Sequence, residues 1–167
     1  SEGGQPGLGV HRSALFDALL AVARGAGVRI VPGHRVTGRR GQRLTFAGHP
    51  DSARFDLIVD AAGAGSPLSP LRARPLSYGA LWGWVDWPED TLLPYDHLSQ
   101  VYRGASRMLG VLPVGAVPGQ TGRKAAVFWS LRADGEADWR AAGLAAWQEE
   151  AARLWPEFAA FAAQITD

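Results

Sequence analysis

Small residues directly follow an apolar segment near the middle of the chain, and they leave the backbone accessible. The apolar segment is 55–60 (Phe-Asp-Leu-Ile-Val-Asp), and Gly63, Gly65 and Ser66 lie within the next six residues. Backbone N–H groups beside such glycines can approach a phosphate closely. A tight turn after a buried strand needs the same residue types, and Asp60 would then cap that turn. The residues themselves leave both interpretations open.

Arg12 stands at the start of another segment that could bind an anion. We expect Ser13 to cap a helix there, with apolar residues at helical spacing at Leu15, Phe16, Leu19, Leu20 and Ala23. A cation is unfavourable at the positive end of a helix dipole, which favours a binding role for the Arg12 guanidinium. Its planar fork can pair with a phosphate. The alternative is an arginine exposed to solvent.

Aromatic side chains concentrate in one predicted strand, which spans 76–87. The chain has seven tryptophans, and three of them lie in this segment. Alternation along a strand puts Tyr78, Ala80, Trp82 and Trp84 on one face and Leu81, Val85 and Trp87 on the other. Tyr78, Trp82 and Trp84 could therefore line an apolar substrate pocket. The alternative for each tryptophan is packing against helical partners such as Trp147 and Trp155.

Residue types exclude several other kinds of site. The chain has no cysteine, which excludes disulfides, thiolate zinc sites and cysteine nucleophiles. The four histidines lack metal-ligand spacing, and Ser66 has neither the companions nor the flanking motif of a hydrolase nucleophile. We predict no metal site and assign no catalytic side chain.

Composition narrows the classes of partner. Lys and Arg number 17 against 16 Asp and Glu, so the formal net charge of +1 argues against a nucleic-acid surface. No apolar run approaches the roughly 20 residues of a membrane helix, and no secretory signal opens the sequence. We expect a soluble, cytoplasmic protein that binds neither nucleic acid nor membrane. The sequence does not decide whether the protein forms a homodimer.

The predicted elements change character near residue 70. Up to that point we expect a helix, a strand at 28–31, a hairpin of 34–39 with 43–47, and a buried strand at 55–60. These are pieces of a parallel α/β domain. Beyond it we expect an antiparallel sheet of strands 76–87, 98–104, 107–114 and 124–131, followed by C-terminal helices. The prediction is an α+β fold with an incomplete cofactor domain at 1–70 and a substrate domain at 71–167.

Three stretches together resemble the FAD-dependent aromatic hydroxylases, the flavoprotein monooxygenases of the p-hydroxybenzoate hydroxylase type. They are residues 10–33, beginning Val-His-Arg-Ser, residues 55–68, and the aromatic strand 78–86 with Gly-Val-Leu-Pro at 110–113. The resemblance covers most of the chain from about Leu8 onward. It implies that Arg12, Asp60, Gly63, Gly65 and Ser66 belong to an FAD site, and that one sheet face covers the flavin.

The sequence departs from that family pattern at two places. The N-terminal Gly-x-Gly-x-x-Gly fingerprint and the late Gly-Asp motif do not occur between Ser1 and Asp167. Most relatives have Asp-Gly after the buried strand, whereas Ala62 precedes Gly63 here and Asp60 stands two residues earlier. That arrangement is similar to the Asp-Ala-x-Gly form of flavin halogenases and carotenoid cyclases.

The resemblance implies the middle, substrate-domain segment of an oxidoreductase that hydroxylates an aromatic or other apolar small molecule. NADH or NADPH would reduce the FAD, and O2 would supply the oxygen. The alternatives are another enzyme of the flavin superfamily (a reductase, halogenase or cyclase) and a non-catalytic small-molecule binding module. Because the fingerprint is missing, we expect these 167 residues alone to be inactive and not to retain FAD.

Overall fold

The chain has an α+β fold in which an antiparallel sheet is followed by C-terminal helices, as predicted. A computed structural model describes residues 7–71 and 74–166. It divides into two units, one of the described residues up to Ala23 with those from Leu76 onward, and one of Arg24–Pro75. The predicted domain boundary at residue 70 stays a prediction.

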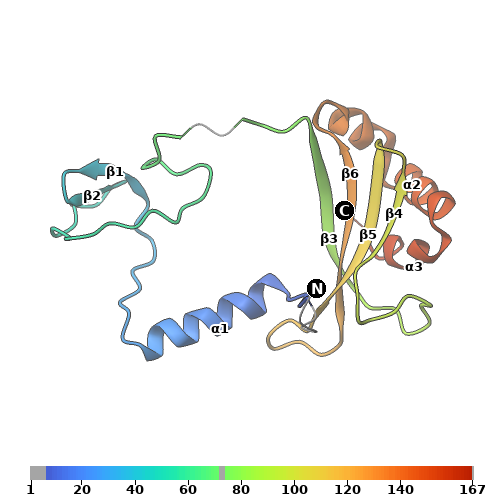
Figure 1. The fold of residues 1–167 in the computed structure, drawn as a ribbon, viewed down its shortest axis with the longest axis horizontal. Helices are drawn as coiled ribbons and strands as arrows, with labels where there is room; N and C mark the ends of the chain where they lie inside the picture. The colour runs from blue at the N-terminus through green and yellow to red at the C-terminus, as the bar shows by residue number, and fades with distance from the viewer. Residues whose placement is uncertain (1–6, 72–73, 167) are drawn as a thin grey trace. The chain divides into compact units, whose positions relative to one another are not determined.

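Four antiparallel strands form the main sheet of the first unit. They are β3 (Tyr78–Asp86), β4 (Ser99–Arg103), β5 (Arg107–Gly115) and β6 (Lys124–Arg132). Each matches a predicted strand to within about two residues. Their order is β3-β6-β5-β4 (Figure 1), so β5 and β6 are central. Central strands have partners on both sides, and β5 and β6 are accordingly the most buried of the four.

One face of this sheet packs against helices and forms the core. The helical elements are η1 (Ala133–Gly135), α2 (Glu136–Leu154), η2 (Pro156–Phe158) and α3 (Ala159–Ala162), and α2 and α3 lie on the same side of the sheet (Figure 1). Alternate residues of β6 point into the core, among them Val127 and Trp129. The core is mostly aromatic and β-branched and comprises Val85, Leu109, Val111, Ala125, Val127, Trp129, Trp147, Ala151, Trp155, Phe158, Phe161 and Ala162.

The C-terminal helix α2 is interrupted at Gly143. This glycine has φ 83° and ψ 165°, whereas its neighbours are helical. Only glycine adopts such a backbone readily, because a Cβ would be strained at positive φ. Trp147 and Ala151 are buried beyond the break. The helix ends at Leu154, since the residue before Pro156 is restricted to extended backbone.

Helix α1 (Arg12–Gly25) begins two residues earlier than a cap at Ser13 predicts, and its cap is a different residue. The His11 ring Nδ1 accepts a hydrogen bond from the Ser13 backbone N–H at 3.2 Å. The Ser13 hydroxyl lies 2.7 Å from the same nitrogen. The prediction that Ser13 caps the helix is therefore wrong, because the imidazole accepts the N–H and Ser13 lies inside the first turn.

Most of the large apolar residues of α1 are exposed. No residue of the helix is buried, and the most exposed of its large apolar side chains are Leu15, Phe16, Leu19 and Val22 at 50–71%. Tertiary packing of one face normally stabilises a helix in a globular protein. The apolar residues of α1 thus have the helical spacing that predicted the helix, but their side chains stay exposed.

The second unit contains the predicted hairpin but neither of the predicted parallel-type strands. β1 (Val36–Arg40) pairs with β2 (Arg43–Phe46) around Gly41, whose φ is 59°. Residues 28–31 and 55–60 have no strand structure, so these two predictions are wrong. A strand needs a hydrogen-bonded neighbour, and no described strand pairs with either segment. Phe55, Leu57 and Val59, from the expected buried strand, are 45–78% exposed.

Candidate functional site: the open face of the main sheet

The face of the main sheet that points away from α2 and α3 presents aromatic side chains to solvent. Tyr78, Trp82 and Trp84 are 41%, 58% and 38% exposed, while Val85 on the opposite face is buried. The predicted alternation along this strand is confirmed. The rings of Trp82 and Trp84 meet edge to face, with centroids 5.1 Å apart. Clusters of exposed aromatic residues of this kind are typical of binding surfaces. We call this surface the open face.

Phe128 from β6 extends the open face across the sheet. Phe128 is the register partner of both Trp82 in β3 and Gly110 in β5. Its ring covers Gly110 so closely that a Cβ there would lie 2.1 Å from the Phe128 Cζ atom. The glycine therefore allows an aromatic ring to lie flat on the neighbouring strand. The residue types did not identify Phe128 or Gly110 as site residues, because only the strand register brings Phe128 beside Trp82 and Gly110 beside Phe128.

His11 bounds the open face near the end of β3. Its ring centroid lies 4.2 Å from that of Trp84, at an angle of 47°. A backbone hydrogen bond of 2.7 Å from the His11 N–H to the Val114 carbonyl holds this residue beside β5. Sequence analysis missed His11, since its only sequence signal was its position just before a helix.

A polar cleft of about 350 Å³ adjoins Trp84 and His11. Lys124 and Asp86 both line this cleft. They are register partners in β6 and β3, and the Lys124 ammonium pairs with the Asp86 carboxylate at 2.5 Å. Gln164 binds the backbone of Asp86 in both directions, accepting from its N–H and donating to its carbonyl at 2.9 Å each. The open face thus has an apolar centre and a charged, hydrogen-bonding edge, which is the usual composition of a small-molecule site.

A second charged pair lies at the other end of β3, beside Tyr78. Arg132 donates to both carboxylate oxygens of Asp134, at 2.9 and 2.5 Å. These hydrogen bonds, with the charge of the guanidinium, hold the pKa of Asp134 below its usual value and raise the pKa of Arg132 above its own. Arg132 also lies 6.0 Å from the Tyr78 ring. Its charge is therefore largely compensated before any ligand arrives.

The residues predicted to hold FAD do not form a dinucleotide cradle among the described residues. Asp60 accepts a 3.1 Å hydrogen bond from the Ala62 N–H, which is the turn-capping alternative. Gly63, at φ 80°, accepts from the Ser66 N–H at 3.0 Å, and Gly65 lies between them in the same exposed turn. The residues directly after this turn, 67–71, are not helical, so the N–H groups and dipole that bind a pyrophosphate are not provided there.

Arg12 is the exposed first residue of α1 and belongs to the other unit. The structure therefore brings the predicted substrate residues Trp82 and Trp84 together, and it joins Gly63 and Ser66 through one turn.

Over residues 7–71 and 74–166, no group of three or more histidine or acidic side chains could hold a metal ion. Within the same ranges, every helix is too short or too polar to cross a membrane. Comparisons with protein-family models, with curated proteins and with solved structures found no match to this chain.

Proposed function

We propose that this chain is the middle, substrate-domain segment of an FAD-dependent monooxygenase-like oxidoreductase of the cytoplasm. The proposed reaction hydroxylates an aromatic or other apolar small molecule with O2 and a nicotinamide cofactor. The proposal starts from the resemblance of residues 10–33, 55–68 and 78–86 to the aromatic hydroxylases. The observation that supports it most directly is the open face, where Trp82, Trp84 and Phe128 present neighbouring aromatic rings on one side of the main sheet.

In this proposal the chain supplies the binding surface, and the flavin and nicotinamide supply the redox chemistry. A planar substrate would stack on Trp82 and Phe128, with its polar end toward the charged edge at Asp86 and Lys124. Aromatic contacts of this kind contribute about 0.5–1.5 kcal/mol each beyond area burial. No side chain of the chain is assigned as an acid or a base.

The unpartnered apolar residues of α1 and of 55–59 add independent support. Those segments have the sequence pattern of a parallel α/β domain, yet their large apolar side chains, among them Phe16, Leu19, Leu57 and Val59, are exposed. Further strands and helices of a flavin domain would cover such surfaces, and would also supply the pyrophosphate site that the turn at Gly63 lacks.

The test is to express the complete open reading frame that includes these residues and to purify the product. We expect stoichiometric FAD and NADH or NADPH oxidation that an aromatic substrate accelerates. Trp82→Ala with Trp84→Ala should raise KM for that substrate about tenfold or more while FAD content stays unchanged. A product without FAD, or a double variant with unchanged KM, would overturn the proposal.

A further inference from the structure

Strand β3 forms one edge of the main sheet (Figure 1), since the described strands follow the order β3-β6-β5-β4. In an antiparallel pair, every second residue directs its N–H and C=O groups at the neighbouring strand, and the residues between direct theirs away. Just before β3, the Ser77 carbonyl accepts from the Ala133 N–H at 2.9 Å. Just after it, the Trp87 N–H donates to the Arg123 carbonyl at 2.8 Å. Odd-numbered residues of β3 therefore bond to β6, and the backbone groups of even-numbered residues point outward.

One of these outward residues, Asp86, is bonded by a side chain that acts like a peptide group of a further strand. The Gln164 amide accepts from the Asp86 N–H and donates to the Asp86 carbonyl, both at 2.9 Å. An amide side chain carries the same donor and acceptor as a peptide unit. Gln164 thus satisfies the edge at Asp86. Among the described residues no such partner reaches the outward backbone groups of Tyr78, Ala80, Trp82 and Trp84. We call this backbone of residues 78–84 the free edge.

The free edge lacks the features that normally prevent strands from pairing. Proteins protect sheet edges with charged side chains, proline or bulges. Between Tyr78 and Val85 the sequence has no Asp, Glu, Lys, Arg or Pro. The register of β3 with β6 runs without a bulge over all nine residues of β3. The other edge strand, β4, is only five residues long and ends in Arg103. A long, unprotected edge of this kind is a surface for another strand.

We propose that the free edge pairs with the free edge of a second copy of this chain, which joins two four-stranded sheets into one continuous sheet. The two β3 strands would run antiparallel about a two-fold axis at Leu81. This register pairs Tyr78 with Trp84 of the second copy, and Ala80 with Trp82. It uses all four outward residues and leaves Asp86 to Gln164. Each of the four pairs exchanges two hydrogen bonds, about eight in all.

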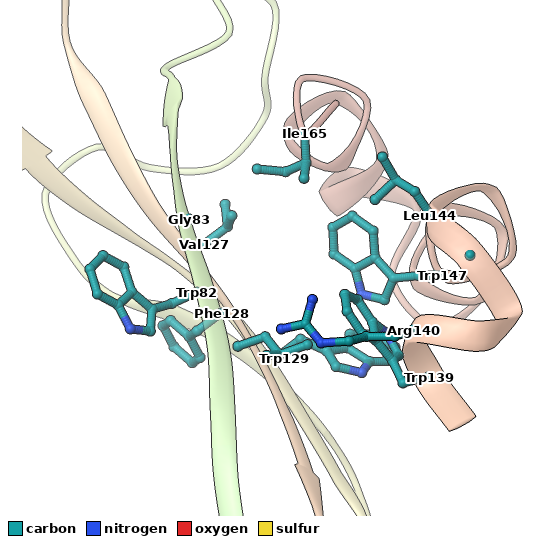
Figure 2. Close-up of a pocket in the computed structure, with 12 residues that line it drawn as sticks. Trp82, Gly83, Val127, Phe128, Trp129, Trp139, Arg140, Leu144, Trp147 and Ile165 are labelled. Atoms are coloured by element: carbon teal, nitrogen blue, oxygen red, sulfur yellow. The ribbon is translucent and has the colours of Figure 1, made fainter. Parts of the chain in front are cut away.

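The side chains of β3 fit a second copy in this register. On the open face, small Ala80 would lie opposite large Trp82, and Tyr78 opposite Trp84. Aromatic pairs directly opposite each other stabilise antiparallel sheets. Figure 2 shows Trp82 extending to the side of the sheet opposite Ile165. On the Ile165 side, Gly79 would lie opposite Gly83, so no side chain of either residue obstructs the approach of the two strands.

The charges near β3 also fit a second copy. Because residues 78–85 carry no charge, two free edges meet without the repulsion that like charges opposite each other cause. The charged residues lie beyond the ends of the free edge, and there they form compensated pairs. Lys124 pairs with Asp86 at one end, and Arg132 pairs with Asp134 at the other. The two-fold axis brings one pair of each copy toward the other pair of its partner, and both pairs are neutral overall.

The first measurement is the mass of the purified 167-residue chain, by light scattering during gel filtration and by sedimentation equilibrium. We expect a concentration-dependent dimer. A monomer at concentrations up to about 1 mM, or a mass that keeps growing beyond the dimer, would overturn the proposal. A monomer would leave the free edge to a strand of a different polypeptide. The result is independent of the proposed oxidoreductase function, because the measurement needs neither flavin nor substrate.

Disulfide cross-linking tests the register, and the chain has no cysteine of its own to interfere. The axis places residue 81 directly opposite residue 81 of the second copy, in a pair whose Cβ atoms lie about 4.5–5.5 Å apart. Leu81→Cys should therefore form a disulfide dimer on mild oxidation. Gly79→Cys is the matched control, since residue 79 would lie opposite residue 83, and should cross-link at least tenfold more slowly. Equal rates for the two variants, or no cross-linking of Leu81→Cys, would contradict the proposed register.

A charge on the free edge should weaken the dimer. Ala80→Lys places two lysines as diagonal neighbours across the axis, where they repel each other. We expect the dissociation constant of the dimer to rise at least tenfold. Gln100→Lys introduces the same residue at an exposed position of β4, the other edge strand, and should leave the dissociation constant unchanged. Circular dichroism checks that both variants are folded. Equal weakening by the two substitutions would show that the β3 edge is not the interface.

Discussion

At the scale of single residues, the open face depends on the contact between Phe128 and Gly110. The Phe128 ring lies where a Cβ of residue 110 would be, so the ring can keep this position only while residue 110 is glycine. Gly110→Ala should destabilise the chain by about 1–3 kcal/mol, because the ring or the strand must move to relieve overpacking. Displacing the ring should also change the surroundings of Trp82, which is its register partner.

The measurement is urea unfolding followed by tryptophan fluorescence. Gly79→Ala is the matched control, because Gly79 lies in β3 with negative φ and nothing within 4 Å of an added Cβ. It should change the unfolding free energy by less than about 0.5 kcal/mol. Equal effects of the two substitutions would mean that the contact between Phe128 and Gly110 does not hold in solution.

At the scale of elements, the break in α2 at Gly143 can be tested independently of any ligand. An added Cβ would meet nothing within 4 Å, so the only cost of Gly143→Ala is the backbone strain at φ 83°. That strain is worth about 1–3 kcal/mol. Gly135→Ala is the control, since Gly135 precedes the same helix at φ −96° with equal space. A stabilising Gly143→Ala would show that α2 is continuous in solution.

At the scale of the whole molecule, the exposed apolar segments and the turn at Gly63 make a joint prediction about FAD. The 167-residue chain, purified and passed over a desalting column after incubation with FAD, should retain no flavin absorbance. No helix begins directly after the glycine turn, because residues 67–71 are not helical. A few remaining contacts, at about 1–3 kcal/mol each, would not offset the 4–15 kcal/mol that association costs. Stoichiometric flavin would place the dinucleotide site elsewhere in these residues.

Local pattern was enough to predict the main sheet and its two faces. Alternation within 76–87 placed Trp82 and Trp84 on one side and Val85 on the other, because side-chain direction in a strand depends only on position. The hairpin of 34–39 with 43–47 was also predicted from local pattern, and β1 and β2 form it. These features need no knowledge of distant parts of the chain.

Local sequence pattern gave wrong predictions where an element needs a neighbouring element to form. Residues 28–31 and 55–60 have the composition of buried strands, yet a strand forms only beside another strand, and none pairs with them among the described residues. The helical spacing of α1 did predict a helix, since its hydrogen bonds lie within the segment itself. The same spacing could not show that Leu15, Phe16 and Leu19 would stay exposed.

The candidate site was decided by the tertiary structure. Tyr78, Trp82 and Trp84 were identified from one strand, but Phe128, Gly110 and His11 join them only through strand register and a backbone contact with β5. Sequence determines which residues a strand or helix presents on each face. The packing of one element on another determines which of those residues meet, and whether their polar atoms find partners.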